Sequence, residues 1–381
     1  MRRMGVIMTV LCLVVGLLPV WVCAAPAEVA AKSALLMDAA TGTVLFEQNP
    51  HEPLAPASVT KVMTLLLIME AIDSGKLSWE DTVTASEAAA AKGGSQIYLK
   101  VGETMTVSDM VKSIAVSSAN DCACAMAEHL EGSEEAFVER MNQRAQELGM
   151  SDTHFVNCTG LDDGPDAASH LTSAWDIALM SRELLTNHPD IKKFTTIWMD
   201  TVRNGSFGLS NTNKLIRFYS GATGLKTGFT SSAGYCLSAS ALRDGMELIA
   251  VVLGSKTSQE RFGACKSLLD YGFANYALVT PEVQTVQVPV TLGATQSVTA
   301  VPARTPRLLI DKAQKSGVTT VLEQKDRVDA PVSRGQRLGT LTVKAGQQVL
   351  DQIPLVADTA VPKLTFSQMY QKILKRLTMA A

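Results

Sequence analysis

The sequence predicts a fold of the α/β class, in the α+β arrangement: a five-stranded antiparallel sheet with a helical lobe, then a small all-β domain and a C-terminal amphipathic helix. Two hairpin patterns stand far apart, at residues 33–48 and 234–254, with a mostly helical pattern between them. From about residue 280, apolar and polar residues alternate, as in Val-Gln-Thr-Val-Gln-Val-Pro-Val at 283–290. Alternation is typical of half-buried strands, so the later part predicts a separate β domain.

Length and composition fit two globular domains. The chain has 381 residues, of which 46% are hydrophobic and 19% are charged. The change in pattern near residue 280 places the first domain at 27–278 and the second at 280–358. The formal net charge is -3, so the charge balance gives no reason to expect a nucleic-acid partner.

Residues 1–24 have the pattern of a secretion signal. A basic start precedes a long apolar stretch, and Val-Cys-Ala at 22–24 offers a cleavage site. Cleavage after Ala24 is favoured because Pro26 would follow a cut one residue later. Two alternatives stay open: an uncleaved N-terminal anchor, or a lipid on Cys23. We therefore expect a secreted protein that acts outside the cytoplasmic membrane.

The cysteines do not predict a disulfide framework, because an odd and scattered set remains after the signal. They are Cys122, Cys124, Cys158, Cys236 and Cys265. The sequence has neither a Cys-x-x-Cys pair nor a His-Glu-x-x-His motif. We therefore expect no metal site and no cofactor.

A long apolar run at 62–72 follows Pro56 and Ser58. A proline and a serine before such a run indicate a helix that begins near Ser58. Because residues 65–69 are apolar on every face, the helix is expected in the core. Lys61 then needs an explanation, since lysine is almost never buried without a partner.

Ser58 and Lys61 are three residues apart and share one helical face. An amine beside a hydroxyl, shielded from water at the positive end of a helix, loses proton affinity and can take the hydroxyl proton. The alternative is that Lys61 extends to solvent and Ser58 only caps the helix.

Two further motifs follow in the chain, Ser-Ala-Asn at 118–120 and Lys-Thr-Gly at 226–228. S-x-x-K, S-D-N and K-T-G in this order form the signature of class A β-lactamases and penicillin-binding proteins, and this chain has alanine at the middle position of the second motif. The sequence resembles the secreted D-alanyl-D-alanine carboxypeptidases, the low-molecular-mass penicillin-binding proteins of serine peptidase family S11. The resemblance covers nearly the whole mature chain and extends to Gly-Gly-Ser at 93–95, Phe-Val-Asn at 155–157, and the segments 170–176, 211–213 and 224–230.

The resemblance implies a penicillin-binding/β-lactamase-like fold and a serine D-alanyl-D-alanine carboxypeptidase. Ser58 would be the nucleophile that forms an acyl-enzyme, Lys61 the general base, and Ser118 the relay that returns a proton to the leaving amine. The substrate-binding residues would be Asn120, Lys226, Thr227, Gly228, Thr230 and Arg261. Peptidoglycan stem peptides would be the substrate, and β-lactams would inhibit by acylating the serine.

The chemistry of the backbone and side chains at these positions indicates more detailed roles. The backbone N–H groups of Ser58 and of a residue near Thr230 would hold the oxyanion. Asn120 would bond Lys61 and the substrate amide. Both burial and the nearby cation of Lys226 would lower the pKa of Lys61.

The K-T-G motif would lie on an edge strand. Lys226 and Thr227 would receive the substrate carboxylate there, and Gly228 would leave room for an extended peptide.

Structural alternatives remain for several of these residues. Ser118 or Asn120 would suit the N-cap of the following helix. Arg261 would suit a solvated helix face, and His170 a purely structural role.

The tail, residues 363–377, is predicted to be helical with one apolar stripe and basic residues beside it. The stripe consists of Phe366, Met369, Tyr370, Ile373, Leu374 and Leu377. Such a helix suits a membrane interface, and it lies on the membrane because no apolar span of roughly 20 residues exists outside the signal. The alternative is packing on its own β domain.

Other functions share these motifs. Class A β-lactamases add a glutamate that primes the deacylating water. The corresponding region, 157–168, offers Asp162, Asp163 and Asp166 but no glutamate. A peptidoglycan endopeptidase and a non-catalytic β-lactam-sensing or wall-binding module also stay open. The sequence does not separate a vegetative from a sporulation role, and it is silent on the preferred stem peptide and on the oligomeric state.

Overall fold

A computed structural model describes residues 29–371 of the chain. The predicted signal segment and the end of the tail lie outside the described residues. The first domain contains the predicted five-stranded sheet, with strand order β2-β1-β9-β8-β7 and antiparallel neighbours throughout. Its strands are β1 (Ser33–Asp38), β2 (Val44–Gln48), β7 (Ala222–Thr230), β8 (Gly234–Arg243) and β9 (Met246–Ser255).

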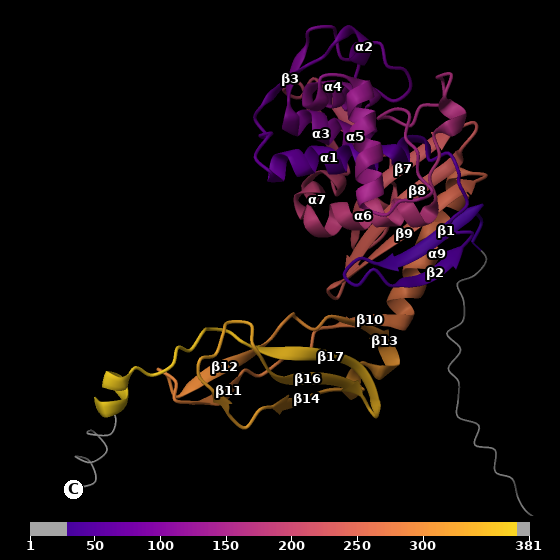
Figure 1. Cartoon of the computed structure of the whole chain (residues 1–381). Coiled ribbons are helices and arrows are strands. Elements are labelled where there is room, and N and C mark those ends of the chain that lie inside the picture. Colours follow the sequence, from indigo (N-terminus) through magenta and orange to yellow (C-terminus); the bar gives the residue numbers. More distant parts are fainter. Residues whose placement is uncertain (1–28, 372–381) are drawn as a thin grey trace, which may run out of the picture.

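Two apolar layers cover the two faces of this sheet. Alternate residues of β1 point to opposite faces: Leu35 packs with the helical lobe, and Leu36 packs with α9 (Ser258–Asn275). The lobe helices are α1 (Lys61–Asp73), α2 (Glu87–Ala90), α3 (Val107–Ser117), α4 (Asn120–Glu131), α5 (Glu134–Glu147), α6 (Ala174–Asn187), α7 (Lys192–Thr195) and α8 (Leu215–Phe218). Figure 1 shows the lobe on one side of the sheet and α9 on the other.

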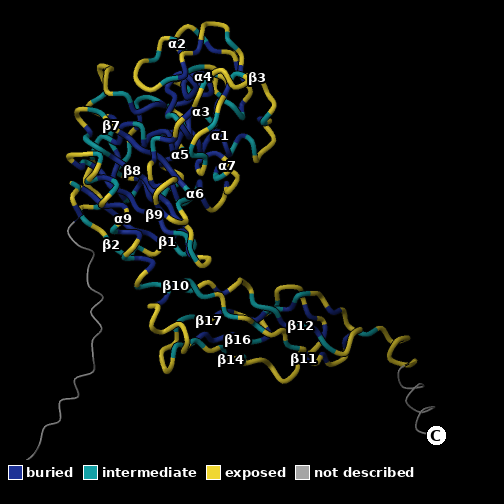
Figure 2. Tube along the Cα trace, turned by 180° about the vertical axis from the view of Figure 1, so that it is seen from behind, coloured by how far each residue is buried: buried dark blue, intermediate teal, exposed yellow. Residues whose placement is uncertain are grey.

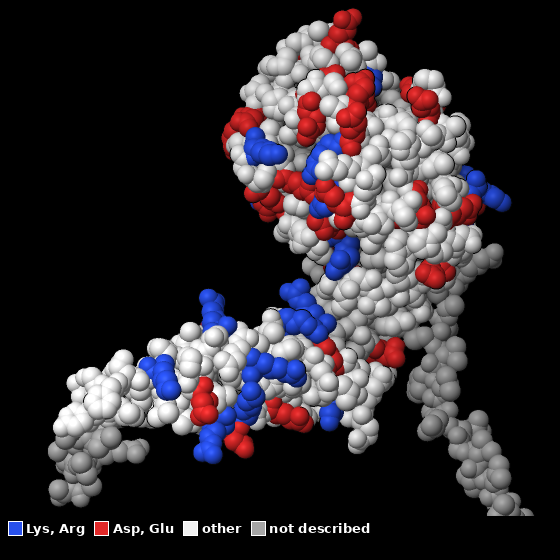
Figure 3. All heavy atoms as spheres, viewed as in Figure 1, with Lys and Arg blue, Asp and Glu red and all other residues white. Residues whose placement is uncertain are grey.

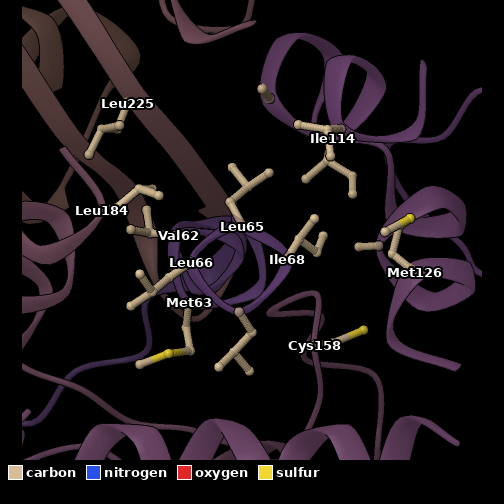
Figure 4. Packing of buried hydrophobic residues seen from close by; sticks show 14 of the residues in the cluster. Val62, Met63, Leu65, Leu66, Ile68, Ile114, Met126, Cys158, Leu184 and Leu225 are labelled. Atoms are coloured by element: carbon tan, nitrogen blue, oxygen red, sulfur yellow. The ribbon is translucent and has the colours of Figure 1, made fainter. Parts of the chain in front are cut away.

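The helix α1 lies in the middle of the larger core, as its apolar sequence predicts. Figure 4 shows its side chains pointing outward in several directions, toward the sheet and toward neighbouring helices. Val62, Leu65, Leu66 and Ile68 are all fully or almost fully buried. The chain enters this helix through a 3₁₀ turn at Ala57–Thr60, so the regular α-helix begins at Lys61 rather than at Ser58.

Short hairpins complete the lobe. Strands β3 (Thr82–Thr84) and β4 (Thr104–Thr106) pair with each other, as do β5 (Met199–Val202) and β6 (Phe207–Ser210).

The second domain is built of β-strands, as predicted. Its six-stranded sheet has the order β14-β16-β17-β12-β11-β15, and β10 pairs with β13 at the junction with α9. The strands are β10 (Tyr276–Val279), β11 (Val286–Thr291), β12 (Ser297–Pro302), β13 (Leu308–Asp311), β14 (Val318–Gln324), β15 (Val328–Asp329), β16 (Arg337–Ala345) and β17 (Gln348–Ala357). Figure 2 shows that its buried core is much thinner than that of the first domain.

The tail differs from its prediction at its start. Lys363 forms a β-bridge with Gly293, so the predicted helix does not begin there. Helix begins at Phe366, where Thr365 accepts from the backbone N–H of Gln368. Phe366 is 81% exposed. The predicted stripe residues Ile373, Leu374 and Leu377 lie outside the described residues. Within residues 29–371, no helix is long and apolar enough to cross a membrane.

Candidate active site

The structure brings Ser58 and Lys61 into direct contact at the entry to α1. Lys61 Nζ lies 2.9 Å from Ser58 Oγ, and it also donates to the backbone carbonyl of Thr159 at 2.7 Å. Neither Ser58 nor another side chain caps this helix, because no side-chain cap bond is present at its entry. The geometry therefore disfavours the alternative in which Ser58 is only a cap.

The amine of Lys61 is held away from water, because the side chain is 0% exposed. Burial lowers its pKa to about 7, against the opposing effects of Cys158 and Asp121. A neutral amine is therefore accessible at neutral pH. A neutral amine hydrogen-bonded to a hydroxyl can accept its proton, so the pair has the chemistry of a base and a nucleophile.

Two glycines fix the turn that carries Ser58. A Cβ on Gly228 of β7 would lie 2.5 Å from the Pro56 carbonyl oxygen, and a Cβ on Gly160 would lie 1.9 Å from the Ala57 carbonyl oxygen. Ala57 itself has a φ of 48°, which is uncommon for a residue with a side chain. The sequence predicts that Gly228 leaves room for an extended peptide. The structure adds a second reason, because the turn that carries Ser58 packs where a Cβ of residue 228 would lie.

Ser118 and Asn120 lie at the junction of α3 and α4. Ser118 is buried and adopts a left-handed conformation with a φ of 64°. Asn120 is the first residue of α4, whose N-cap is Ala119 without a side-chain cap bond. The N-cap alternative for Ser118 and Asn120 is therefore wrong.

The predicted bond between Asn120 and Lys61 is not formed. Asn120 Nδ2 instead donates to the Gly93 carbonyl at 2.7 Å, and its Oδ1 is buried without a hydrogen-bond partner. A buried acceptor without a partner costs free energy unless a ligand or water supplies a donor. Asn120 is thus oriented by Gly93, and its free acceptor suits an amide N–H.

The K-T-G motif lies on β7, which is the edge strand of the sheet, as predicted. Lys226 is buried and donates to the Thr227 backbone carbonyl at 2.9 Å. The Thr227 hydroxyl donates to Thr212 Oγ1 at 2.6 Å. Thr230 ends the strand, and its hydroxyl oxygen accepts from the backbone N–H of Ala233 in the following turn.

The pKa of Lys226 lies well below its usual value, because the amine is buried and the cations of Lys61 and Arg261 lie nearby. For Lys61, burial is the main cause, and Lys226 is not among the groups that shift it. The expected influence of one lysine on the other therefore acts on Lys226. A bound carboxylate would supply the negative charge that this side chain lacks.

Arg261 does not lie on a solvated helix face. It is buried beneath the β7–β8 hairpin, where its Nη1 donates to the carbonyls of Gly228 at 2.9 Å and Cys236 at 3.2 Å. Its guanidinium lies over the ring of Tyr235 at 5.2 Å. Arg261 therefore supports the K-T-G strand from behind and adds positive charge near Lys226.

Sequence motifs single out the loop at 155–168, but sequence reasoning missed the contact that this loop makes with Lys61. Thr159 supplies the carbonyl that holds Lys61, although no side-chain motif marks a backbone oxygen. Glu134 of α5 holds the same loop, because its carboxylate accepts from the Cys158 backbone N–H at 3.2 Å and pairs with Lys92 at 2.5 Å. No glutamate lies in the loop itself, but one lies against it.

A cavity of about 300 Å³ adjoins this loop, with Gly93, Thr159 and Leu161 in its lining. Because Gly93 also holds Asn120, the cavity begins beside the predicted substrate-binding amide.

One group in the described residues has the spacing of metal ligands: Glu70, Glu183 and His188, whose ligand atoms lie within 4.8 Å of one another. Arg144 already pairs with both carboxylates, at 2.6 and 2.8 Å, and His188 pairs with Asp73. These groups form an ion-pair network between α1, α5 and α6, far along α1 from Ser58.

Comparison with known proteins gives two matches to family models. Residues 21–257 match the family described as D-alanyl-D-alanine carboxypeptidase, and residues 275–363 match the C-terminal domain of penicillin-binding protein 5. D-alanyl-D-alanine carboxypeptidase DacF of Bacillus subtilis (strain 168) is 44% identical over 343 residues, which cover 88% of this chain and 87% of that protein.

Solved structures agree with these matches. Penicillin-binding protein 5 from Haemophilus influenzae superposes with a TM-score of 0.75 at 30% identity, covering 89% of this chain and 99% of that one. Penicillin-binding protein D2 from Listeria monocytogenes, solved in an ampicillin-bound form, has a TM-score of 0.57 at 33% identity and covers 65% of this chain and 98% of that one.

Proposed function

The chain belongs to the D-alanyl-D-alanine carboxypeptidases of peptidase family S11, and we propose that it removes the terminal D-alanine from peptidoglycan pentapeptides through an acyl-enzyme on Ser58. One observation carries the proposal: a buried lysine with a pKa of about 7 lies 2.9 Å from a serine hydroxyl. A solvated lysine, with a pKa of about 10.4, would not serve as a base at neutral pH.

The reaction begins when the neutral amine of Lys61 takes the proton of Ser58 Oγ. The oxygen attacks the carbonyl carbon between the two D-alanines, and the Ser58 backbone N–H is one donor that stabilises the oxyanion. The C–N bond then breaks, and the proton that Lys61 took passes through Ser118 to the departing D-alanine amine. Water hydrolyses the resulting ester and restores the serine.

Charge and burial support the role of Lys226 in binding. The substrate ends in a carboxylate, and Lys226, Arg261 and the Thr227 hydroxyl form the positive end of the site. Binding a carboxylate raises the pKa of Lys226 toward its usual value, because it adds the missing counter-charge. Arg261 contributes from behind the strand, since its Nη1 already donates to the carbonyls of Gly228 and Cys236 and its Nη2 to Ser258 Oγ.

We also propose that β-lactams acylate Ser58 and leave slowly. No glutamate lies in the loop 157–168, and the nearby Glu134 is engaged by Lys92 and Cys158. This arrangement gives no free glutamate to prime a deacylating water, which favours the carboxypeptidase over the β-lactamase alternative.

The direct test is release of D-alanine from a pentapeptide ending in D-Ala-D-Ala, measured with and without penicillin. We expect release that penicillin abolishes, together with covalent labelling of one site. Ser58→Ala should lose both activities, because the nucleophile is gone. Label retained on Ser58→Ala would show that another residue reacts, and labelling without turnover would favour the sensing module.

The location of the protein is a further part of the proposal. A cleaved signal at residues 1–24 would place the protein outside the cytoplasmic membrane, and the helix that begins at Phe366 would hold it on the membrane surface. The exposed ring of Phe366 supports this placement. Deleting 363–381 should release the protein from membranes without lowering soluble activity. Unchanged attachment would identify the N-terminal segment as the anchor.

A further inference from the structure

A chain of hydrogen bonds leads from His170 to the peptide group of the nucleophile. His170 is 3% exposed, and its Nδ1 lies 3.1 Å from the backbone nitrogen of Val156. A backbone N–H can only donate, so Nδ1 is the acceptor and the ring proton is on Nε2. Nε2 then donates to Thr60 Oγ1 at 2.7 Å, and Thr60 Oγ1 donates to the Ala57 carbonyl at 2.8 Å.

The last acceptor of this chain belongs to the reacting part of the site. The Ala57 carbonyl and the Ser58 N–H are two ends of one peptide group. In the proposed function, that N–H is a donor to the oxyanion. A hydrogen bond to the carbonyl oxygen polarises the peptide group and strengthens its N–H as a donor. It also fixes the plane of the group, and thus the direction in which the N–H points.

The surroundings leave this peptide group little other freedom. Ala57 has a positive φ, and Gly160 packs so closely that a Cβ there would collide with both the Ala57 carbonyl and Thr60 Oγ1. The Thr60 hydroxyl is therefore enclosed between α1 and the loop, with one acceptor and one donor in reach.

From this geometry we infer that Thr60 and His170 are positioning residues for the oxyanion hole, which orient and polarise the Ala57–Ser58 peptide group. The inference rests on the proposed function, because it needs the Ser58 N–H as an oxyanion donor. It assigns functional parts to two side chains that touch neither the substrate nor the reacting hydroxyl.

The charge state of His170 agrees with this assignment. Burial, with smaller contributions from the nearby His154 and Lys61, lowers its pKa to about 4. The ring of Phe155 packs against it, with the ring centroids 5.7 Å apart. The imidazole is therefore neutral throughout the range in which Lys61 acts as a base. A neutral ring keeps Nδ1 available for Val156 and directs its single proton to Thr60.

The test measures acylation by a fluorescent penicillin in Thr60→Val, which keeps the shape and removes the hydroxyl. Thr195→Val is the matched control, because Thr195 is equally buried and donates to a backbone carbonyl, that of Thr223, at 2.6 Å. Removing an oxyanion donor costs about 10²–10³ in rate. Here the donor stays but is weaker and less fixed, so we expect Thr60→Val to acylate roughly 10-fold to 100-fold more slowly.

Both valine variants should lower the melting temperature similarly, while only Thr60→Val slows acylation, and Thr60→Ser should restore the rate. Penicillin affinity before acylation should change little. If Thr60→Val acylates no more slowly than Thr195→Val, the inference is wrong and the chain is only structural.

If Thr60→Val does not fold, a second variant, His170→Asn, tests the same inference. His170→Asn places an oxygen near the position of Nδ1, so it keeps the acceptor for Val156 and loses the donor to Thr60. It should slow acylation in the same range, and a wild-type rate would contradict the inference. Failure of the wild-type protein to release D-alanine would instead refute the proposed function.

Discussion

The two domains treat buried polarity in opposite ways. The interior of the first domain contains charged side chains, including Lys61, Lys226 and Arg261. Among the described residues of the second domain, Thr342 is the one buried polar side chain, and the core is made of aliphatic residues such as Leu341 and Ile353. Buried charge costs stability unless it is paired, so the first domain accepts a cost that the second does not.

This difference in buried charge marks the first domain as the one that contains the candidate active site. The cations of the first domain gather at the meeting of α1, β7 and α9, where Lys61 and Arg261 add to the effect of burial in lowering the proton affinity of Lys226. The second domain keeps its charges on the surface, and Figure 3 shows Lys and Arg side chains along it on the face displayed. The first domain therefore carries buried charge around the candidate site, and the second has an aliphatic core.

The largest expected effect comes from removing the buried amine. Lys61→Met should abolish acylation and raise the melting temperature by about 5 °C or more, because a pKa lowered from 10.5 to about 7 corresponds to roughly 3–5 kcal/mol of unfavourable burial. The gain should be full below about pH 7 and vanish as the pH rises toward 10.5, since the unfolded chain binds more protons in that window.

Lys61→Arg is the matched variant, because arginine stays charged. It should also lose acylation but should not become more stable. Differential scanning calorimetry and penicillin labelling measure both properties. Normal acylation in either variant would identify another base.

The next effect concerns the contact between β7 and the nucleophile turn. Gly228→Ala should slow acylation by about 100-fold, because its Cβ would lie 2.5 Å from the Pro56 carbonyl oxygen and must displace the turn. Gly263→Ala in α9 is the control, since nothing lies within 4 Å of its added Cβ. Rates measured by stopped-flow acylation should separate the two, and equal rates would mean that the turn can shift freely.

A smaller effect is the dependence of acylation on pH. The rate should rise about 10-fold per pH unit below pH 7 and level off above it, because only the neutral amine of Lys61 accepts the proton. Labelling rates between pH 5 and 9 give the profile. A profile that is flat across this range would remove Lys61 from the role of base.

The smallest effect on acylation is expected in the second domain. Leu341→Ala should destabilise that domain by about 2–5 kcal/mol and leave the acylation rate unchanged, because its core is separate. Leu65→Ala makes the same deletion in α1 and should lower the temperature at which acylation is lost. A loss of acylation in Leu341→Ala at ordinary temperature would show that the two domains depend on each other.

Local spacing explains what the sequence could predict. Ser58 and Lys61 are three residues apart, so a helix alone brings them together. The hairpin β8–β9 and the helix α3 follow from turn residues and apolar periodicity over a few residues. Even a local pattern does not fix where an element begins. Lys363 forms a β-bridge with Gly293 instead of starting the tail helix.

The features that the sequence could not predict are contacts between segments that lie far apart in the chain. The Thr159 carbonyl reaches Lys61 across 98 residues, and His170 reaches Thr60 across 110. Backbone acceptors carry no side-chain signal. The sequence marks His170 as a candidate but does not show that it contacts Thr60. It predicts a helical position for Arg261 but not the burial of its side chain beneath β7.

The turn at Ala57–Thr60 has a consequence for how this protein is assayed. Its reactive shape depends on Gly160, His170 and Gly228, which join it only after widely separated parts of the chain have docked. A chain that has collapsed without this docking holds the serine but not its environment. Covalent capture of a fluorescent penicillin would therefore count correctly assembled molecules, and would serve as a readout of folding.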